Sequence, residues 1–203
     1  MILLQKPKAG QLQAFLARQA KVDFSYQAIG FTAAEPPSSY VVDHTRVELG
    51  RGQAVYDCAK AALQRWAQFR TGWLEIWPED SSIRQGQTVV IVARSLGLWW
   101  LNACRIVYIL PDDDSGDDGP RRFGFAYGTL PDHVGTGEER FLVEMDAMGR
   151  VWYDILAFSR PQHPLAQLGY PFVRIVQKQF GRASSSAMRR AIARGASAAA
   201  CLG

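Results

Sequence analysis

The sequence predicts an α+β protein in which one antiparallel sheet of six or seven strands packs against helices. Three observations support this prediction. Apolar residues recur at steps of three and four from Val55 to Phe69, as they do in an amphipathic helix. From Trp73 to Ser159 the sequence consists of β-branched and aromatic runs separated by turn residues, which is typical of strands. Helical spacing returns after Pro171, so the last element should be a helix.

The N-terminal third should contain two helices and one strand. A short helix is expected over 9–20, where the apolar residues share one side. The segment 29–40 contains a glycine and a Pro-Pro pair, which break regular structure, so it should be a loop. A strand over 40–50 ends at a glycine. The amphipathic helix follows, and its apolar face consists of Val55, Ala59, Ala62, Trp66 and Phe69.

The middle of the chain should be a series of neighbouring strands. Strands are expected over 88–95, 99–110 and 150–159, and two more within 121–145. The short turns between successive strands require antiparallel pairing, because parallel strands need a long crossover. The acidic segment 111–120 should be a long, mobile hairpin loop.

The C-terminal helix should begin near Pro171, because the first turn of a helix tolerates proline. Gly181 and three serines follow, and a glycine inside a helix costs about 0.8–1 kcal/mol relative to alanine. The helix therefore either ends near Phe180 or continues because small residues let it lie close to a sheet; we favour continuation. Residues 1–194 should form a single domain, followed by a flexible, alanine-rich tail over 195–203.

The composition argues against several classes of protein. Hydrophobic residues make up 48% of the 203 residues, which is enough for one domain with a sizeable core. The net charge is +4, but the basic residues are scattered and form no dense stripe of the kind that binds nucleic acid. No apolar run approaches the ~20 residues of a membrane span, so we expect no stable membrane insertion.

The cysteines and histidines point to neither a metal site nor a cofactor. Cys58, Cys104 and Cys201 are far apart and odd in number, which fits a reducing, cytoplasmic location. The three histidines lack the spacing of metal ligands. The N-terminus has too few consecutive apolar residues for a signal peptide. We therefore expect no cofactor, and the sequence gives no indication of the oligomeric state.

Glu139 is the sharpest candidate for a functional residue. Strand alternation places it with the apolar residues of 138–145 and places Glu138 with the charged ones. If the apolar face is buried, the Glu139 carboxylate needs a partner or its pKa rises. Either outcome gives an unusual acid, suited to act as a general base or as a ligand anchor. Alternatively, Glu139 stands first in its strand and reaches solvent around the turn.

Three other residues could act with Glu139. Arg105 shares a side of its strand with Trp99, and an Arg105–Glu139 pair would satisfy both charges and could grip a carboxylate or hydroxyl group of a ligand. His133 lies on the turn before the glutamates, where a solvated position competes with an acid or base role. Tyr127 could polarise a substrate.

Other polar residues also alternate with apolar ones in this region. For Asn102 and Asp154 the better interpretation is a solvent-facing side of the sheet, which antiparallel sheets commonly have.

The stretch 121–129 has aromatic side chains on one face and almost none on the other. Phe123, Phe125 and Tyr127 share the first face and could line a binding site, as could Trp99. The second face consists of small residues, which let another backbone or a flat ligand approach closely; the small-residue C-terminal helix is the obvious candidate. Alternation leaves open which face is concave. An ordinary packed core without a cavity is the alternative.

The motifs "RFGFAYGTLPDHVGTGEERF", "YDCAKAALQRW" and "AFSRP" followed by "PFVRIVQKQF" resemble an uncharacterised family of bacterial and plant proteins. That family is known only as a domain of unknown function, and the resemblance extends from about Phe24 to Met188. More distantly, the order of elements is similar to the helix-grip fold of the START-like (SRPBCC) superfamily, which includes lipid-transfer domains and aromatic cyclases. This similarity implies a curved sheet that grips the long C-terminal helix, with an apolar ligand cavity between them.

Three functions are compatible with the sequence. The first is binding of a small apolar or aromatic molecule, or a lipid, in the cavity between the sheet and the C-terminal helix. The second is an enzyme of the cyclase, isomerase or hydrolase type that uses Glu139 and His133 as acid and base. The third is a protein-interaction module that uses the Trp99–Trp100 pair and the basic C-terminal helix.

Overall fold

One antiparallel sheet of eight strands forms the centre of the structure. A computed structural model describes residues 1–112, 120–161 and 170–200, except for the side chains of 161, 170–173 and 196–200. Seven strands follow the order β2-β8-β7-β6-β5-β4-β3, and β1 pairs with β5. The strands are β1 (Ile2–Leu3), β2 (Val41–Arg51), β3 (Leu74–Trp77), β4 (Thr88–Ser95), β5 (Leu98–Leu110), β6 (Arg121–Thr129), β7 (Gly135–Met145) and β8 (Arg150–Pro161).

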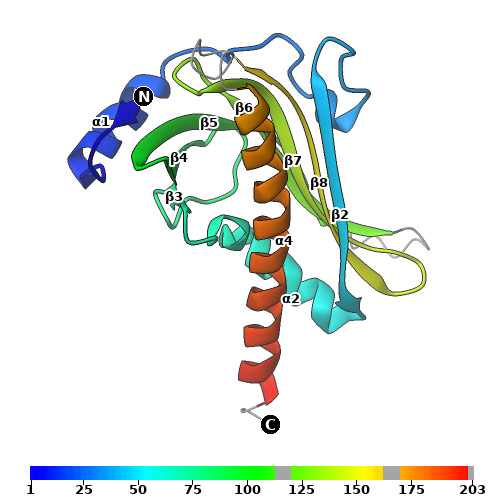
Figure 1. Cartoon of the computed structure of the whole chain (residues 1–203). Coiled ribbons are helices and arrows are strands. Elements are labelled where there is room, and N and C mark those ends of the chain that lie inside the picture. The colour runs from blue at the N-terminus through cyan, green and yellow to red at the C-terminus, as the bar shows by residue number, and fades with distance from the viewer. Residues whose placement is uncertain (113–119, 162–169, 201–203) are drawn as a thin grey trace.

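The sheet curves around the long C-terminal helix, which gives the expected helix-grip arrangement (Figure 1). The helices are α1 (Ala9–Gln19), α2 (Gln53–Gln64) and α4 (Tyr170–Ala200), with short 3₁₀ turns η1 (Phe31–Ala33) and η2 (Ala67–Phe69). In Figure 1, α4 crosses the concave face, with α2 beside its lower half. Leu12 and Phe15 of α1 pack with Val90 and Leu101, on the other face of the sheet.

The amphipathic helix predicted over 54–69 divides into α2 and η2 at Trp66. Trp66 has a left-handed backbone (φ 55°), and its indole Nε1 donates a hydrogen bond to the Ser81 carbonyl at 2.7 Å. The Trp66 ring lies 4.9 Å from the Phe125 ring, and the Phe69 ring lies 5.7 Å from the Phe141 ring. The aromatic face of β6 is therefore the concave face, and α2 with η2 covers part of it.

The small-residue face of β6 is convex, and the segment that covers it is not the C-terminal helix that the sequence suggested. A Cβ added at Gly128 would lie 2.1 Å from the Tyr26 hydroxyl, so neither the C-terminal helix nor a ligand fills this position. The loop after α1 covers it instead. This loop is fixed by the buried Glu138, which accepts hydrogen bonds from the Tyr26 hydroxyl (2.7 Å), the Gly30 amide (2.7 Å), and the amide and hydroxyl of Thr32 (2.9 and 2.5 Å).

Helix α4 continues through Gly181, as the small residues predicted. A Cβ at Gly181 would lie 2.8 Å from Thr45 Oγ1 in β2, so glycine allows the helix to approach the sheet closely. One turn later, the Ser184 hydroxyl forms a 2.8 Å hydrogen bond with the buried Tyr153 hydroxyl. The helix extends to Ala200, and the division into a domain over 1–194 and a tail over 195–203 stays a prediction. Most of the acidic segment 111–120 lies outside the described residues.

A β-bulge in β5 changes the faces predicted for that strand. Arg105 and Ile106 pair with Gly128 and Tyr127, and after the bulge Tyr108 pairs with Ala126. The residues after the bulge therefore face opposite to a simple alternation. Tyr108 turns to the convex face, where its hydroxyl lies 2.7 Å from that of Thr32.

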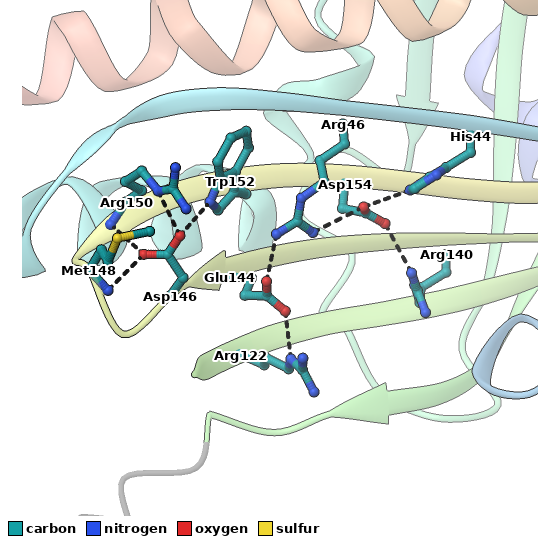
Figure 2. Close-up of polar contacts among 10 residues, drawn as sticks. All are labelled: His44, Arg46, Arg122, Arg140, Glu144, Asp146, Met148, Arg150, Trp152 and Asp154. Carbon is teal, nitrogen blue, oxygen red and sulfur yellow. Dashed lines mark hydrogen bonds and ion pairs between the residues drawn. The ribbon is translucent and has the colours of Figure 1, made fainter. Parts of the chain in front are cut away.

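The convex face of β2, β8, β7 and β6 carries a network of charged side chains (Figure 2). Asp154, almost fully buried, accepts hydrogen bonds from His44 Nε2 at 2.7 Å, Arg140 at 2.9 Å and Arg46 at 3.2 Å. Arg46 also donates to Glu144 at 2.6 Å, as does Arg122. The sequence favoured a solvent-facing position for Asp154; the structure corrects this, because the side chain is buried under its partners.

The Asp154→Asn variant should unfold more easily than the wild-type protein. Burial alone would raise the pKa of Asp154, but the hydrogen bonds from His44, Arg140 and Arg46 outweigh it and lower the pKa below its usual value. Removing this carboxylate should reduce the free energy of unfolding by about 2–3 kcal/mol at pH 7.

Because the folded-state pKa is lowered, the stabilisation is present above the unfolded-state pKa and is lost as pH falls through the folded-state pKa. Urea unfolding at pH 7 and pH 3 should therefore show a smaller difference between the two proteins in acid. Glu35→Gln, at an exposed carboxylate, is the control and should be neutral. Equal stability of the Asp154→Asn and wild-type proteins at pH 7 would contradict the prediction.

Candidate functional site: a cavity between the sheet and α4

A cavity of about 570 Å³ lies between the concave face of the sheet and the first turns of α4. It is lined by the β4–β5 and β6–β7 turn regions, the start of β2, the end of β8 and Val176, Gln177 and Phe180 of α4. Phe69 lines the cavity as well, and its ring stacks on that of Phe180 with the ring centres 5.5 Å apart. The described lining is mainly apolar or aromatic. The cavity therefore occupies the part of the concave face that α2 and η2 leave uncovered.

Glu139 lines this cavity together with Tyr127. The two residues are directly paired across β7 and β6, and the Tyr127 hydroxyl donates a 2.6 Å hydrogen bond to Glu139 Oε2. Glu139 is half-buried, and its accessible surface faces the cavity. The strand begins at Gly135, four residues earlier, so Glu139 is not the first residue of the strand.

The position of Glu139 makes its ionisation unusual. Burial raises the pKa of Glu139 to about 7; the Tyr127 hydrogen bond partly opposes this effect, and the nearby charge of Asp43 adds to it. Burial likewise raises the pKa of Tyr127 well above its usual value. Near neutral pH, Glu139 can therefore gain or lose a proton, while Tyr127 stays protonated and can only donate to it.

His133 lines the same cavity, but burial shifts its pKa in the opposite direction to that of Glu139. Burial lowers the pKa of His133 to about 4, so its ring is neutral at physiological pH. Its Nδ1 lies 3.0 Å from both the amide and the carbonyl of Gly135, which holds the ring against the β6–β7 turn. A neutral histidine can orient a polar group, but it is not the imidazolium form that acts as a general acid near neutral pH.

The structure separates Arg105 from Glu139, which corrects the suggested ion pair. Arg105 pairs with Gly128 and lies on the convex side, where it donates to the carbonyls of Gln19, Ala20 and Val22 at 2.8–3.1 Å. These carbonyls end α1, where a cation is favourable because of the helix dipole. Arg105 therefore fixes α1 to the sheet.

The proposed aromatic ligand contacts are only partly found at the cavity. Tyr127 lines it, whereas Phe123 and Phe125 belong to the filled core beyond Phe69, and Trp99 packs near α1 on the convex side. Two other tryptophans, Trp73 and Trp100, line the cavity instead.

Two polar residues of the cavity were missed or assigned to the wrong environment. Asn102 lines the cavity instead of facing solvent, and its side-chain oxygen accepts a 3.3 Å hydrogen bond from the Val134 amide. Asp43 also lines the cavity, and both of its carboxylate oxygens accept hydrogen bonds from Arg174 of α4. Alternation within β2 places Asp43, Thr45 and Val47 on one face, and this pattern could have identified Asp43 as a residue of the concave face.

In the described part of the chain, no three His, Cys, Asp or Glu side chains are grouped so that they could hold a metal ion. None of the described helices is long and apolar enough to span a membrane.

The chain has a helix-grip fold with a cavity between the sheet and α4. The family model named "Domain of unknown function (DUF1990)" matches residues 25–187, and the chain belongs to this family. A UPF0548 protein of Dictyostelium discoideum is 32% identical over 95% of this chain and 96% of its own. A UPF0548 protein of Deinococcus radiodurans is 37% identical over 90% of this chain and 94% of its own.

Among solved structures, a hypothetical protein of Helicobacter pylori has a similar fold. Its TM-score is 0.50 at 12% sequence identity, covering 83% of this chain and 98% of the other. At this level of identity, the similarity concerns the fold alone.

The raised pKa of Glu139 predicts a pH-dependent cost to stability. Below about pH 4.5 the carboxyl is protonated in both the folded and unfolded states, whereas between pH 4.5 and about 7 the folded state binds the proton more tightly. The wild-type protein should therefore lose stability relative to Glu139→Gln as the pH rises from about 4.5 to about 7, by up to about 3 kcal/mol in total.

Chemical unfolding of both proteins at pH 5 and pH 8 measures this difference. Glutamine can still accept the Tyr127 hydrogen bond, so the variant should be the more stable protein at pH 8. A constant difference between pH 5 and pH 8 would show that Glu139 titrates normally.

Proposed function

We propose that this protein binds a small apolar or aromatic molecule, or a lipid, in the cavity between the sheet and α4. The observation that supports this most directly is the cavity itself, which has the volume of a typical small-molecule site. Such sites combine apolar walls with a few well-placed polar groups, and here Glu139, Tyr127 and Asn102 are those groups.

Access to the cavity is from the end of the sheet that carries the β4–β5 turn. Leu96, at the tip of this turn, lines the cavity and is 72% exposed, so the cavity reaches the surface here. Leu96 also has a left-handed backbone (φ 54°), which is costly for a side chain of this size. A strained, exposed leucine at the mouth supports a role in contacting an incoming apolar molecule.

The proposed cellular location is the cytoplasm, and it rests on the cysteines. Cys58 and Cys104 are free thiols, which supports a reducing compartment such as the cytoplasm.

Proton transfer is a second candidate function, favoured by the Glu139–Tyr127 pair. A carboxyl group with a pKa of about 7 can act as a general base near neutral pH, and a phenol 2.6 Å away can orient it. The neutral His133 would then bind substrate instead of supplying a proton. Conversion of a bound ligand that is lost in Glu139→Gln, with binding kept, would establish this function.

Filling the cavity should abolish binding. Ala157 lines the cavity between Asp43 and Glu139, so Ala157→Phe adds a ring inside it. Titration with the neutral fluorophore N-phenylnaphthylamine should show saturable binding to wild-type protein that weakens about tenfold or more in the variant.

Ala34→Phe is the matched control, because it adds the same ring at an exposed position. It should bind the fluorophore as the wild-type protein does. Absence of saturable binding to the wild-type protein, together with no bound mass in native mass spectrometry of gently purified protein, would refute the proposed function.

A further inference from the structure

Four residues form a row across the concave face at the cavity. Asp43 pairs with Ala157, Ala157 with Glu139, and Glu139 with Tyr127. Neighbouring strands lie about 4.8 Å apart, so the two acidic residues are two strands, or roughly 10 Å, apart in this row. The alanine between them leaves space on the cavity wall for a ligand group.

The two carboxylates of this row differ in how their charge is balanced. Both oxygens of Asp43 are bound by the Arg174 guanidinium, which neutralises its charge. Within the described part of the chain, the Glu139 carboxylate accepts a hydrogen bond only from the neutral Tyr127 hydroxyl, at Oε2. Among the described residues, Glu139 Oε1 has no hydrogen-bond partner, although it belongs to a side chain that lines the cavity. One acceptor at the cavity wall is thus left for a ligand.

Among the residues that the structure describes, the groups around Glu139 provide no balancing cation. Tyr127, Cys104, Tyr153 and Asp43 are its electrostatic neighbours on β6, β5, β8 and β2, and all of them are neutral or acidic.

Basic groups near the cavity are few and already engaged. Among the described lining residues, Arg160 is the only arginine or lysine. Its guanidinium lies 4.8 Å from the centre of the Tyr40 ring. Arg160 is three residues beyond Ala157 in β8, about 10 Å along the strand, and exposed. On α4, Arg174 is bound to Asp43, and on the β6–β7 turn His133 is neutral. As far as the described side chains go, a ligand group beside Glu139 therefore meets an acceptor and no unpaired positive charge.

We propose that the cavity selects apolar molecules that present a hydrogen-bond donor, either an ammonium or a hydroxyl group, to Glu139, and that it excludes molecules that present a carboxylate there. This inference rests on the proposed function, because it names the class of molecule that the same cavity accepts. A donor would satisfy Oε1, and an ammonium would also balance the charge of Glu139 in a site of low dielectric. A carboxylate would place two like charges side by side.

Three ligands with one ring system test the proposal: naphthylmethylamine, naphthylmethanol and naphthoate. Calorimetric titration at pH 8 should give the tightest binding for the amine, weaker binding for the alcohol, and binding of the carboxylate about tenfold or more weaker than that of the alcohol. In Glu139→Gln the amine should lose about tenfold in affinity, and the carboxylate should gain. Lowering the pH to 5 should reproduce the effect of the variant, because protonation removes the same charge.

Two further variants separate the role of the carboxylate from general effects. Tyr127→Phe keeps the Glu139 carboxylate and removes its partner, so amine affinity should not fall. Glu35→Gln removes an exposed carboxylate outside the cavity and should leave all three affinities unchanged.

The outcomes distinguish this inference from the proposed function. Carboxylate binding as tight as that of the amine would overturn the inference while the cavity remains a binding site, and so would an order of affinities that is unchanged in Glu139→Gln. Absence of binding of all three compounds and of N-phenylnaphthylamine would overturn the proposed function and the inference together.

Discussion

Two consecutive carboxylates in β7 determine how both faces of the sheet are used. Strand alternation sends Glu138 to the convex face and Glu139 to the concave face. Four donors satisfy Glu138, and all of them come from the loop after α1. Glu139 accepts a hydrogen bond from Tyr127, its one donor among the described residues, and faces the cavity. The first carboxylate therefore stabilises the fold, whereas the second is available for chemistry or binding.

The cavity exists because the helices cover the concave face only in part. Trp66, Phe69 and Phe141 fill the region between α2 and the sheet, and Phe180 of α4 closes over them. Beyond these rings, the first turns of α4 are the helical cover of the wall in the described residues. A packed core would be more stable than a cavity of this size, and the proposed binding function would account for that cost in stability.

The sequence predicted the order of elements well because most elements are long enough to show a clear periodicity, as the 12 residues of α2 and the 11 residues of β7 do. It also placed Glu139 correctly with the apolar residues of its strand, since that argument needs only the local alternation. The prediction for β5 was wrong beyond residue 106, because the bulge reverses the faces and leaves no recognisable mark in the sequence. Arg105 was misassigned for a different reason: its partners are backbone carbonyls at the end of α1, which no side-chain pattern reveals.

The contact between Gly181 and Thr45 sets how near α4 lies to β2. In a relative with a bulkier residue at this position, the helix would have to tilt outward or Thr45 would have to turn away. An outward tilt would widen the space under its first turns, so a single small-to-large exchange would change the size of molecule that the fold admits without altering any residue that touches it. The dimensions of the site would then evolve separately from its chemistry.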